Sequence, residues 1–393
     1  MGQLTDAKTG DAGDRAGSSQ VAINGKFLGA DFTAVHRVAG ELVAGMDRLR
    51  QRGAYTDLDA EVIRIAGFPE PPPFATFPMR AIGPLKGQPW EQLELPFVSR
   101  GRLLVNLCNL APVAASRAIT LIHDAQVFSS PASYSWAFAA WYRTIYRANG
   151  RRHVIATISE FSRQELVRFG VARPENIHVI SNGVDHMLRP APDVRILDRH
   201  GLRTSPYVLA IANAQPHKNV SVLLRAFQRA ELSPFRLVLF GAAGPEAFEA
   251  SGETIAHNVQ FVGRVSDAEL RALMENALCT AFPSRTEGFG MPPLEGMLLG
   301  APAIISPCGA LPEVCGSSAI LADPDRPDAW ASAIVGLAAD EDRRRRLSAA
   351  GSAHAASFTW DRAAGSLLDL VASVARGGKF GAGSRDRALT PAV

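Results

Sequence analysis

The sequence has little cysteine, no long apolar stretch and almost no net charge. Its four cysteines, Cys108, Cys279, Cys308 and Cys315, show neither CxxC spacing nor a histidine cluster, so neither a zinc site nor a disulfide framework is indicated. The formal net charge of +3 lacks the basic surplus of a nucleic-acid binder. No apolar run approaches the roughly 18 residues of a spanning helix, and the first residues lack the apolar core of a signal peptide. We expect a cytoplasmic protein, at most peripheral at the inner face of the membrane, with no nucleic acid as partner.

The length and the apolar pattern together predict two domains. A chain of 393 residues exceeds the size at which one hydrophobic core stops growing. Short apolar runs of the kind that form buried parallel strands alternate with helical patterns. In the first half these runs are 20–24, 103–107, 118–122, 154–158 and 178–180, and in the second half they are 207–211, 237–240, 259–262, 278–282, 303–305 and 319–321. This alternation predicts an α/β protein with two Rossmann-like, doubly wound domains.

The predicted domains leave short connecting and terminal segments. We expect a first domain over 20–190, a linker over 191–205 and a second domain over 206–357. A helix over 358–375 could cross back to the first domain, while 1–19 and 376–393 have the composition of disordered ends. Ligands of open α/β sheets bind outside the carboxyl ends of the strands, so a cleft between the two domains is the expected binding site.

The segment 287–295, Glu-Gly-Phe-Gly-Met-Pro-Pro-Leu-Glu, is the most informative part of the chain. It places two carboxylates, Glu287 and Glu295, eight residues apart. Gly288 and Gly290 permit backbone angles and a close approach that a Cβ atom would prevent, so a ligand could lie against the main chain there. Paired carboxylates with such a loop between them are typical of a binding site for a polar ligand.

The two prolines in this segment indicate where a helix begins. Pro292 and Pro293 suit the first positions of a helix, and the residue before them, Met291, is expected to be extended. Glu287 is therefore predicted on a loop, and Glu295 in the first turn of the helix that follows. An acidic residue in a first turn also complements the helix dipole, which could explain Glu295 without any ligand, but it does not explain Glu287.

Several segments together resemble family 4 glycosyltransferases, which adopt the GT-B fold of two Rossmann-like domains. The Glu-x7-Glu block at Glu287 and Glu295 is the most specific of them, and the resemblance spans roughly residues 20–375. The segments that carry it are 207–219, 261–267, 282–295, 309–314 and 358–360, together with Leu121-Ile-His123-Asp124-Ala125.

The resemblance implies a binding site for a sugar nucleotide. It places the ammonium of Lys218 at the leaving diphosphate, Glu287 at hydroxyls of the donor sugar, Glu295 at the ribose hydroxyls and His123 beside the sugar. Ionised carboxylates suit this task because they accept hydrogen bonds from hydroxyl groups. The remaining donor-binding residues that it implies are Gly288, Phe289, Gly290 and Met291 for the sugar and phosphates, and Gly263, Arg264 and Val265 for the base.

Other readings of these residues stay open at this point. A histidine at a strand end, such as His123, is often a structural residue whose ring is hydrogen-bonded within the protein. Arg264 could be a surface residue. Ser159 or Ser162 could cap a helix, with a capping box between Ser162 and Glu165. The aromatic residues Trp136, Phe138, Trp141 and Tyr142 could meet a lipid-linked acceptor or form core.

One departure from the family pattern concerns the first domain. Many relatives carry glycine in the loop near the donor phosphates, whereas this chain has Ala34, which cannot freely take a positive φ. A direct backbone contact with the donor is therefore in doubt there. Arg37 could bind phosphate or acceptor, or lie on a helix surface.

The resemblance implies a retaining hexosyltransferase that needs no cofactor and no metal. The favoured donor is GDP-mannose, and the favoured acceptor is a glycan, which could be lipid-linked, in bacterial surface or exopolysaccharide synthesis. No Asp-x-Asp signature stands at a plausible metal site, and Lys218 with helix N-termini can replace a divalent cation. The alternatives are the same fold with UDP-glucose or another nucleotide sugar, a sugar-nucleotide epimerase, or a non-catalytic scaffold.

Overall fold

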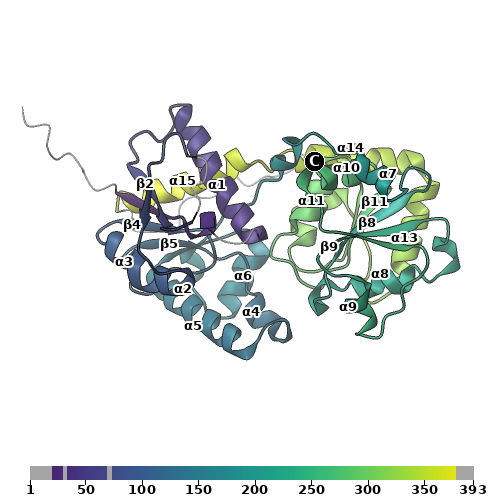
Figure 1. Cartoon of the computed structure of the whole chain (residues 1–393), viewed down its shortest axis with the longest axis horizontal. Helices are drawn as coiled ribbons and strands as arrows, with labels where there is room; N and C mark the ends of the chain where they lie inside the picture. Colours follow the sequence, from purple (N-terminus) through teal and green to yellow (C-terminus); the bar gives the residue numbers. More distant parts are fainter. Residues whose placement is uncertain (1–19, 30–32, 69–72, 378–393) are drawn as a thin grey trace, which may run out of the picture.

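The computed structural model describes residues 20–29, 33–68 and 73–377 and folds them into two α/β units (Figure 1). Each unit is built on a parallel β-sheet covered by helices, which confirms the predicted pair of Rossmann-like domains. The end segments 1–19 and 378–393, for which disorder was predicted, lie outside the described residues.

The first sheet has seven strands in the order β3-β2-β1-β4-β5-β6-β7, all parallel. Two of them were not predicted. In β2 the charged Glu61 and Arg64 interrupt the apolar pattern, and β3 is an exposed edge strand. The strands are β1 (Val21–Asn24), β2 (Ala60–Ile65), β3 (Met79–Ile82), β4 (Leu103–Asn106), β5 (Ala118–Leu121), β6 (Val154–Thr157) and β7 (Ile177–Val179).

Helices cover both faces of this sheet (Figure 1). The hydroxyl of Thr33 caps the first long helix by accepting from the amide of His36. Val38, Leu42 and Met46 form its buried stripe. The helices of this unit are α1 (Ala34–Gln51), α2 (Gly87–Pro89), α3 (Leu95–Val98), α4 (Gln126–Ser129), α5 (Trp136–Arg152) and α6 (Glu160–Arg168), and a π-helical turn, η2 (Trp90–Glu94), joins α2 to α3.

The second sheet has six parallel strands in the order β10-β9-β8-β11-β12-β13. All six lie where the apolar runs predicted strands. They are β8 (Tyr207–Ala212), β9 (Arg236–Gly241), β10 (Val259–Gly263), β11 (Cys279–Phe282), β12 (Ala303–Ile305) and β13 (Ile320–Leu321). The helices of this unit are α8 (Val220–Ala226), α9 (Pro245–Glu249), α10 (Asp267–Glu275), α11 (Met291–Leu298), α12 (Leu311–Cys315), α13 (Pro327–Ala339) and α14 (Glu341–Ala355).

Two segments join the units. The short helix α7 (Arg195–Arg199) lies in the stretch expected as linker, and its Ile196 and Leu197 pack in the core of the second unit. The last helix, α15 (Trp360–Ala375), returns to the first unit and lies along α1 (Figure 1). The two helices pack closely at Gly45, where a Cβ atom would come within 2.9 Å of the carbonyl oxygen of Trp360.

The strand order places a switch point in each sheet. In the first sheet β1 lies between β2 and β4, and in the second β8 lies between β9 and β11. At such a point the connections that follow two adjacent strands run to opposite faces of the sheet. This opens a crevice at the carboxyl ends of the strands. The segments after β5, β8 and β11 lie at these ends and carry His123, Lys218 and Glu287.

Candidate active site

Lys218 and Glu287 form an ion pair at the carboxyl edge of the second sheet. The Nζ atom of Lys218 lies 2.8 and 2.9 Å from the two carboxylate oxygens of Glu287. The buried Ser284 donates its hydroxyl to Oε1 of the same carboxylate at 2.6 Å. Both charged side chains keep some exposure, 20% for Lys218 and 14% for Glu287. The pair can therefore exchange partners when a polar ligand enters.

The loop that carries Lys218 is fastened to its neighbours by Asn219. This residue adopts a left-handed backbone conformation, with φ of 53°, which asparagine tolerates better than most residues. Its side-chain amide donates to the carbonyl oxygens of Pro283 and Pro324 at 3.1 and 2.8 Å. The amide of Arg285 donates to the carbonyl of His217. The loops after β8 and β11 are thus held together, which keeps Lys218 opposite Glu287.

Helix α11 begins one residue earlier than the prolines predicted. Gly290 has a φ of 93°, as expected of a glycine needed for its conformation, and precedes the helix. Met291 is the first helical residue, so the prediction of an extended Met291 was wrong. Glu295 consequently lies in the second turn of the helix and not in the first. The left-handed Gly290 already turns the chain into the helix, so the prolines follow at its second and third positions.

Gly288 serves a contact between the two units. The buried hydroxyls of Ser159 and Ser162 donate to its carbonyl oxygen at 2.6 and 3.0 Å. A Cβ atom on Gly288 would lie 2.8 Å from the carbonyl oxygen of His123. Ser159 also caps α6 by accepting from the amide of Ser162, so the capping box predicted between Ser162 and Glu165 was wrong. The close approach that this glycine permits is to the first unit.

His123 is buried at the end of β5 and has one firm hydrogen bond on its ring. Nε2 lies 3.0 Å from the carbonyl oxygen of Leu107, which only accepts, so the proton is on Nε2. No partner contacts Nδ1 within the described parts of the chain. Burial lowers the pKa of His123 to about 4. The ring is therefore neutral at physiological pH and could accept from a hydroxyl only through Nδ1.

This pKa predicts an acid-sensitive contribution to stability. The unfolded chain takes up a proton at His123 below about pH 6.5, whereas the folded chain does so only near pH 4, so the free energy of unfolding falls as pH drops through this window. Between pH 7 and pH 5 the loss from this residue is about 2 kcal/mol. His123→Gln can still donate to Leu107 but does not titrate. Between pH 7 and pH 5 we expect its free energy of unfolding, measured with urea, to fall by about 2 kcal/mol less than that of the native chain. Parallel pH profiles of the two proteins would contradict this assignment.

Asp124, the neighbour of His123, is coupled electrostatically to the ion pair. Burial raises the pKa of its carboxyl, while the amide of Gln126, which donates to it at 2.9 Å, and the charge of Lys218 oppose that rise. The charge of Glu287 raises the pKa further. The first unit therefore brings His123 and Asp124 to the ion pair of the second unit.

Glu295 lies in a buried contact with His186. It is only 5% exposed, and Nε2 of the buried His186 lies 3.2 Å from its Oε1 atom. His186 belongs to the 3-10 turn η5 (Asp185–Leu188), which joins the two units. Sequence reasoning did not single out His186, because a histidine after an Asn-Gly turn has no signal of its own.

Gly263, Arg264 and Val265 lie at the same edge of the second sheet but further away. Gly263 ends β10, an edge strand that β9 separates from β8, and the other two residues follow it. Gly263 has a φ of 73°, and no atom would lie within 4 Å of a Cβ placed on it. Arg264 is exposed. Among the described residues, the Cβ side of Gly263 is therefore open.

Two further contacts join the units across the site. The guanidinium of Arg37, at the start of α1, forms a bidentate ion pair of 2.6 and 2.8 Å with Asp267 at the start of α10. The carboxylate of Glu313 accepts from the amides of Glu160 and Phe161 at 2.7 and 2.9 Å and so caps α6 from the other unit. Arg37 thus has a partner across the cleft, which neither of its sequence interpretations foresaw.

Some aromatic side chains of α5 lie on the surface. Trp136 is 84% exposed, and Trp141 and Phe138 are also exposed, whereas Tyr142 is partly buried. The interpretation of this group as core is therefore wrong for the two tryptophans and for Phe138.

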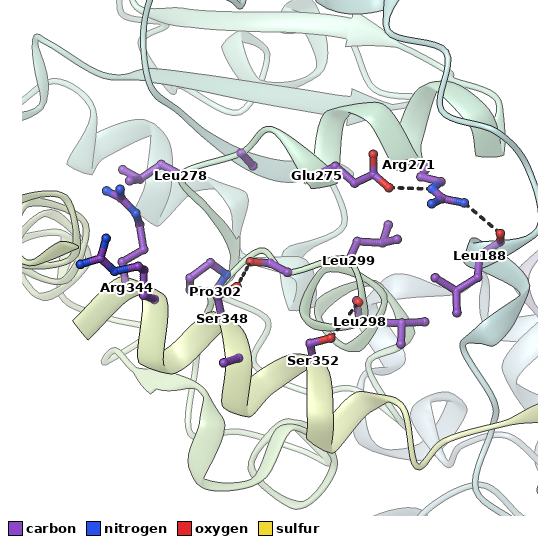
Figure 2. A pocket seen from close by; sticks show the side chains of 14 residues that line it. Leu188, Arg271, Glu275, Leu278, Leu298, Leu299, Pro302, Arg344, Ser348 and Ser352 are labelled. Carbon is purple, nitrogen blue, oxygen red and sulfur yellow. Dashed lines mark hydrogen bonds and ion pairs between the residues drawn. The ribbon is translucent and has the colours of Figure 1, made fainter. Parts of the chain in front are cut away.

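The cavity shown in Figure 2 lies on the opposite side of the second unit. It has a volume of about 700 Å³, and its floor includes Leu278 and Pro302, which precede β11 and β12 and so mark the amino ends of these strands. Arg271 on its wall donates to the carbonyl oxygens of Leu188 and Pro190 at 2.8 and 2.9 Å. This cavity is separate from the Lys218–Glu287 pair.

Within residues 20–29, 33–68 and 73–377, no group of three or more His, Cys, Asp or Glu side chains could hold a metal ion. None of the helices in the same ranges combines the length and apolar character that crossing a membrane requires.

Two family models match the chain. The model for "Glycosyl transferases group 1" matches residues 195–354, and the model for "Glycosyltransferase Family 4" matches residues 106–187. The first match contains Lys218, Glu287 and Glu295, and the second contains His123.

Curated relatives include two named mannosyltransferases. The chain is 30% identical over 320 residues to the MMP alpha-(1->4)-mannosyltransferase of Mycolicibacterium hassiacum, covering 76% of this chain and 74% of the relative. It is 29% identical over 262 residues to the O-antigen chain mannosyltransferase B of Escherichia coli, covering 64% and 68%. D-inositol 3-phosphate glycosyltransferases also match, but the chain spans only about half of their length, for example 50% of the protein from Segniliparus rotundus at 32% identity.

Solved structures share the arrangement of both units. The sucrose-phosphate synthase of Thermosynechococcus elongatus aligns with a TM-score of 0.70 at 17% identity, covering 91% of this chain and 99% of that structure. At this identity the likeness concerns the fold alone, which is GT-B.

Proposed function

Because the chain belongs to glycosyltransferase family 4 and is a hexosyltransferase of the GT-B fold, we propose that it transfers mannose from GDP-mannose to a glycan acceptor with retention of the α configuration. Two relatives whose names specify mannosyl transfer support mannose as the sugar. The acceptor is proposed to be a bacterial surface glycan or exopolysaccharide intermediate, in keeping with the O-antigen enzyme among these relatives.

One observation carries the proposal: the ion pair between Lys218 and Glu287, at the carboxyl edge of the second sheet and before the N-terminus of α11. In the absence of donor each charge neutralises the other. On binding, the ammonium turns to the diphosphate and the carboxylate to hydroxyls of the sugar, so both charges find new partners. The positive end of the α11 dipole adds to the attraction for phosphate. Glu295, further along α11, receives the ribose hydroxyls.

The proposed reaction is a front-face displacement. The bond from the anomeric carbon to the leaving phosphate oxygen breaks while the acceptor oxygen bonds to the same face of that carbon. The acceptor's hydroxyl proton passes to the leaving phosphate oxygen, so no separate base is needed. Negative charge builds on the diphosphate as the bond breaks, and the preorganised cation of Lys218 stabilises it. In this scheme Lys218 and the α11 N-terminus do the work that a divalent cation does in other transferases.

A donor panel tests this function. The purified chain is incubated with GDP-mannose, UDP-glucose or a dTDP-sugar and a mannose-terminated oligosaccharide, with and without EDTA, and the anomeric configuration of the product is read by NMR. We expect an α-linked product from GDP-mannose, at a rate that EDTA does not change. Turnover with UDP-glucose alone would remove the mannose assignment. A donor altered without any acceptor would point to an epimerase.

We also propose that the acceptor is lipid-linked and that the first unit meets it at the membrane surface. Between residues 99 and 152 the chain has seven arginines and a single acidic residue, Asp124. Trp136 and Trp141 project from α5, and Phe97 on α3 is 79% exposed. Exposed tryptophan beside arginine suits the interface of an anionic bilayer, where the rings enter the headgroup region and the guanidinium groups meet the phosphates.

Vesicle binding tests this surface. We expect the chain to sediment with vesicles that contain phosphatidylglycerol and not with vesicles of phosphatidylcholine alone. The double variant Trp136→Ala/Trp141→Ala should bind about tenfold more weakly, because two interfacial anchors are lost. Leu321→Ala, which removes an exposed apolar side chain from the second unit, is the matched control and should bind like the native chain. Equal binding by the double variant would contradict the proposal.

A further inference from the structure

His186 connects the segment between the two units to Glu295. Its side chain is 3% exposed and has a partner on each side. The indole Nε1 of Trp360 donates to Nδ1 of His186 at 3.1 Å, and Nε2 lies 3.2 Å from Oε1 of Glu295. The three residues come from α15, from η5 and from α11, so this contact joins three distant parts of the sequence.

These partners fix which nitrogen of His186 carries the proton. An indole N–H can only donate, so Nδ1 of His186 must accept. The proton of the neutral ring is then on Nε2, which lies 3.2 Å from Oε1 of the Glu295 carboxylate. The Trp360 side chain therefore sets the tautomer, and the tautomer places the protonated ring nitrogen beside one oxygen of Glu295.

The segment that carries His186 is held firmly. Oδ1 of Asp185 accepts from the backbone amide of Trp360 at 2.8 Å, and the amide of Val184 donates to the carbonyl of Phe358 at 2.9 Å. Leu188 lies two residues beyond His186. Its carbonyl oxygen accepts from the guanidinium of Arg271, which Figure 2 shows as a dashed line. His186 is therefore a fixed support for the carboxylate.

We propose that His186 is a positioning residue for the nucleotide: it holds Glu295 in the orientation that accepts both ribose hydroxyls. The inference rests on the proposed function, in which Glu295 receives the ribose. Without His186 the carboxylate would lose the protonated nitrogen beside it and could turn toward solvent or another partner. The residue would then support selection of ribonucleotides over their deoxy counterparts, although it never touches the ligand itself.

Binding of nucleoside diphosphates tests this role without an acceptor or turnover. The affinities of GDP and UDP, each with its 2′,3′-dideoxy counterpart, are measured by calorimetry on the full chain. The native chain should prefer the ribonucleotide, and His186→Leu should reduce that preference about tenfold, as expected for the loss of one polar partner beside a charged group. His186→Gln, whose amide can accept from Trp360 and donate to Glu295, should keep the preference within about twofold.

Two further variants separate positioning from a general loss of structure. Trp360→Phe removes the donor that sets the tautomer and should lower the preference about threefold, which provides a test even if His186→Leu fails to fold. Arg345→Gln removes an exposed ion pair with Glu341 on α14, away from the His186 segment, and should leave the preference unchanged. If the preference is unaltered in whichever of His186→Leu and Trp360→Phe fold, the positioning role of His186 is wrong, while the proposed function stands. A native chain that binds both forms equally overturns the ribose role of Glu295 as well.

Discussion

Replacement of Lys218 by alanine is expected to lower kcat about a thousandfold. Removal of one preorganised group that stabilises developing charge typically costs 10²–10³ in kcat, and here the lost group is a full cation at the leaving diphosphate. The change also leaves the carboxylate of Glu287 with Ser284 as its remaining partner. Initial rates at saturating donor measure the effect, because kcat then excludes weaker binding.

The control for this change is a lysine away from the site. Lys86 is exposed and lies over the ring of Phe68 in the first unit. Lys86→Ala should retain the native kcat within about twofold. If Lys218→Ala kept more than about a fifth of the native kcat, the assignment of Lys218 to the leaving group would be wrong.

Replacement of Glu287 by glutamine is expected to lower kcat/KM about a hundredfold. The amide keeps the size of the side chain and can still accept from Ser284, but it no longer offers a charged acceptor to the sugar hydroxyls. A hydrogen bond to a charged group contributes about 1.5–3 kcal/mol, which accounts for roughly 10- to 100-fold, and the loss of the pairing with Lys218 adds to it. Donor and acceptor titrations of kcat/KM measure this, with thermal unfolding as a check that the fold is intact.

Glu253 provides the matched control for Glu287. It also forms an ion pair in the second unit, with Arg225 of α8 at 2.6 Å. Glu253→Gln should transfer at the native rate. The double variant Lys218→Ala/Glu287→Gln should be much less impaired than the product of the two single effects, because the two residues act as one unit. Multiplicative effects would mean that the ion pair has no shared role.

The parts of the site that could be predicted from sequence are those set by local chemistry. The glycines and prolines between Glu287 and Glu295 indicated a loop entering a helix, and this is what the structure contains. The six strands of the second sheet were visible because buried parallel strands are continuous apolar runs. By contrast β2 was missed, because Glu61 and Arg64 alternate with its buried residues and Glu61 pairs with Arg102 and Arg80.

What could not be predicted depends on contacts between distant parts of the chain. The carboxylate of Glu313 caps a helix that begins 153 residues earlier, and Arg37 pairs with Asp267 across 230 residues. Neither contact has a local pattern, since each requires both units to be placed relative to one another. The same holds for His186, whose neighbours in space come from α11 and α15. Sequence alone therefore indicated the chemistry of the pocket and not the supports that orient it.

The return of α15 to the first unit has a consequence for how the protein is made. Val38, Leu42 and Met46 of α1 lie in one core cluster with Leu367 and Val371 of α15. More than three hundred residues separate the two helices, and at about 5–20 residues per second a ribosome needs roughly 15 to 60 s to cover that distance. During that time the face of α1 that α15 later covers has no α15 to pack against it. The first unit thus completes this core only after the whole second unit has been synthesised.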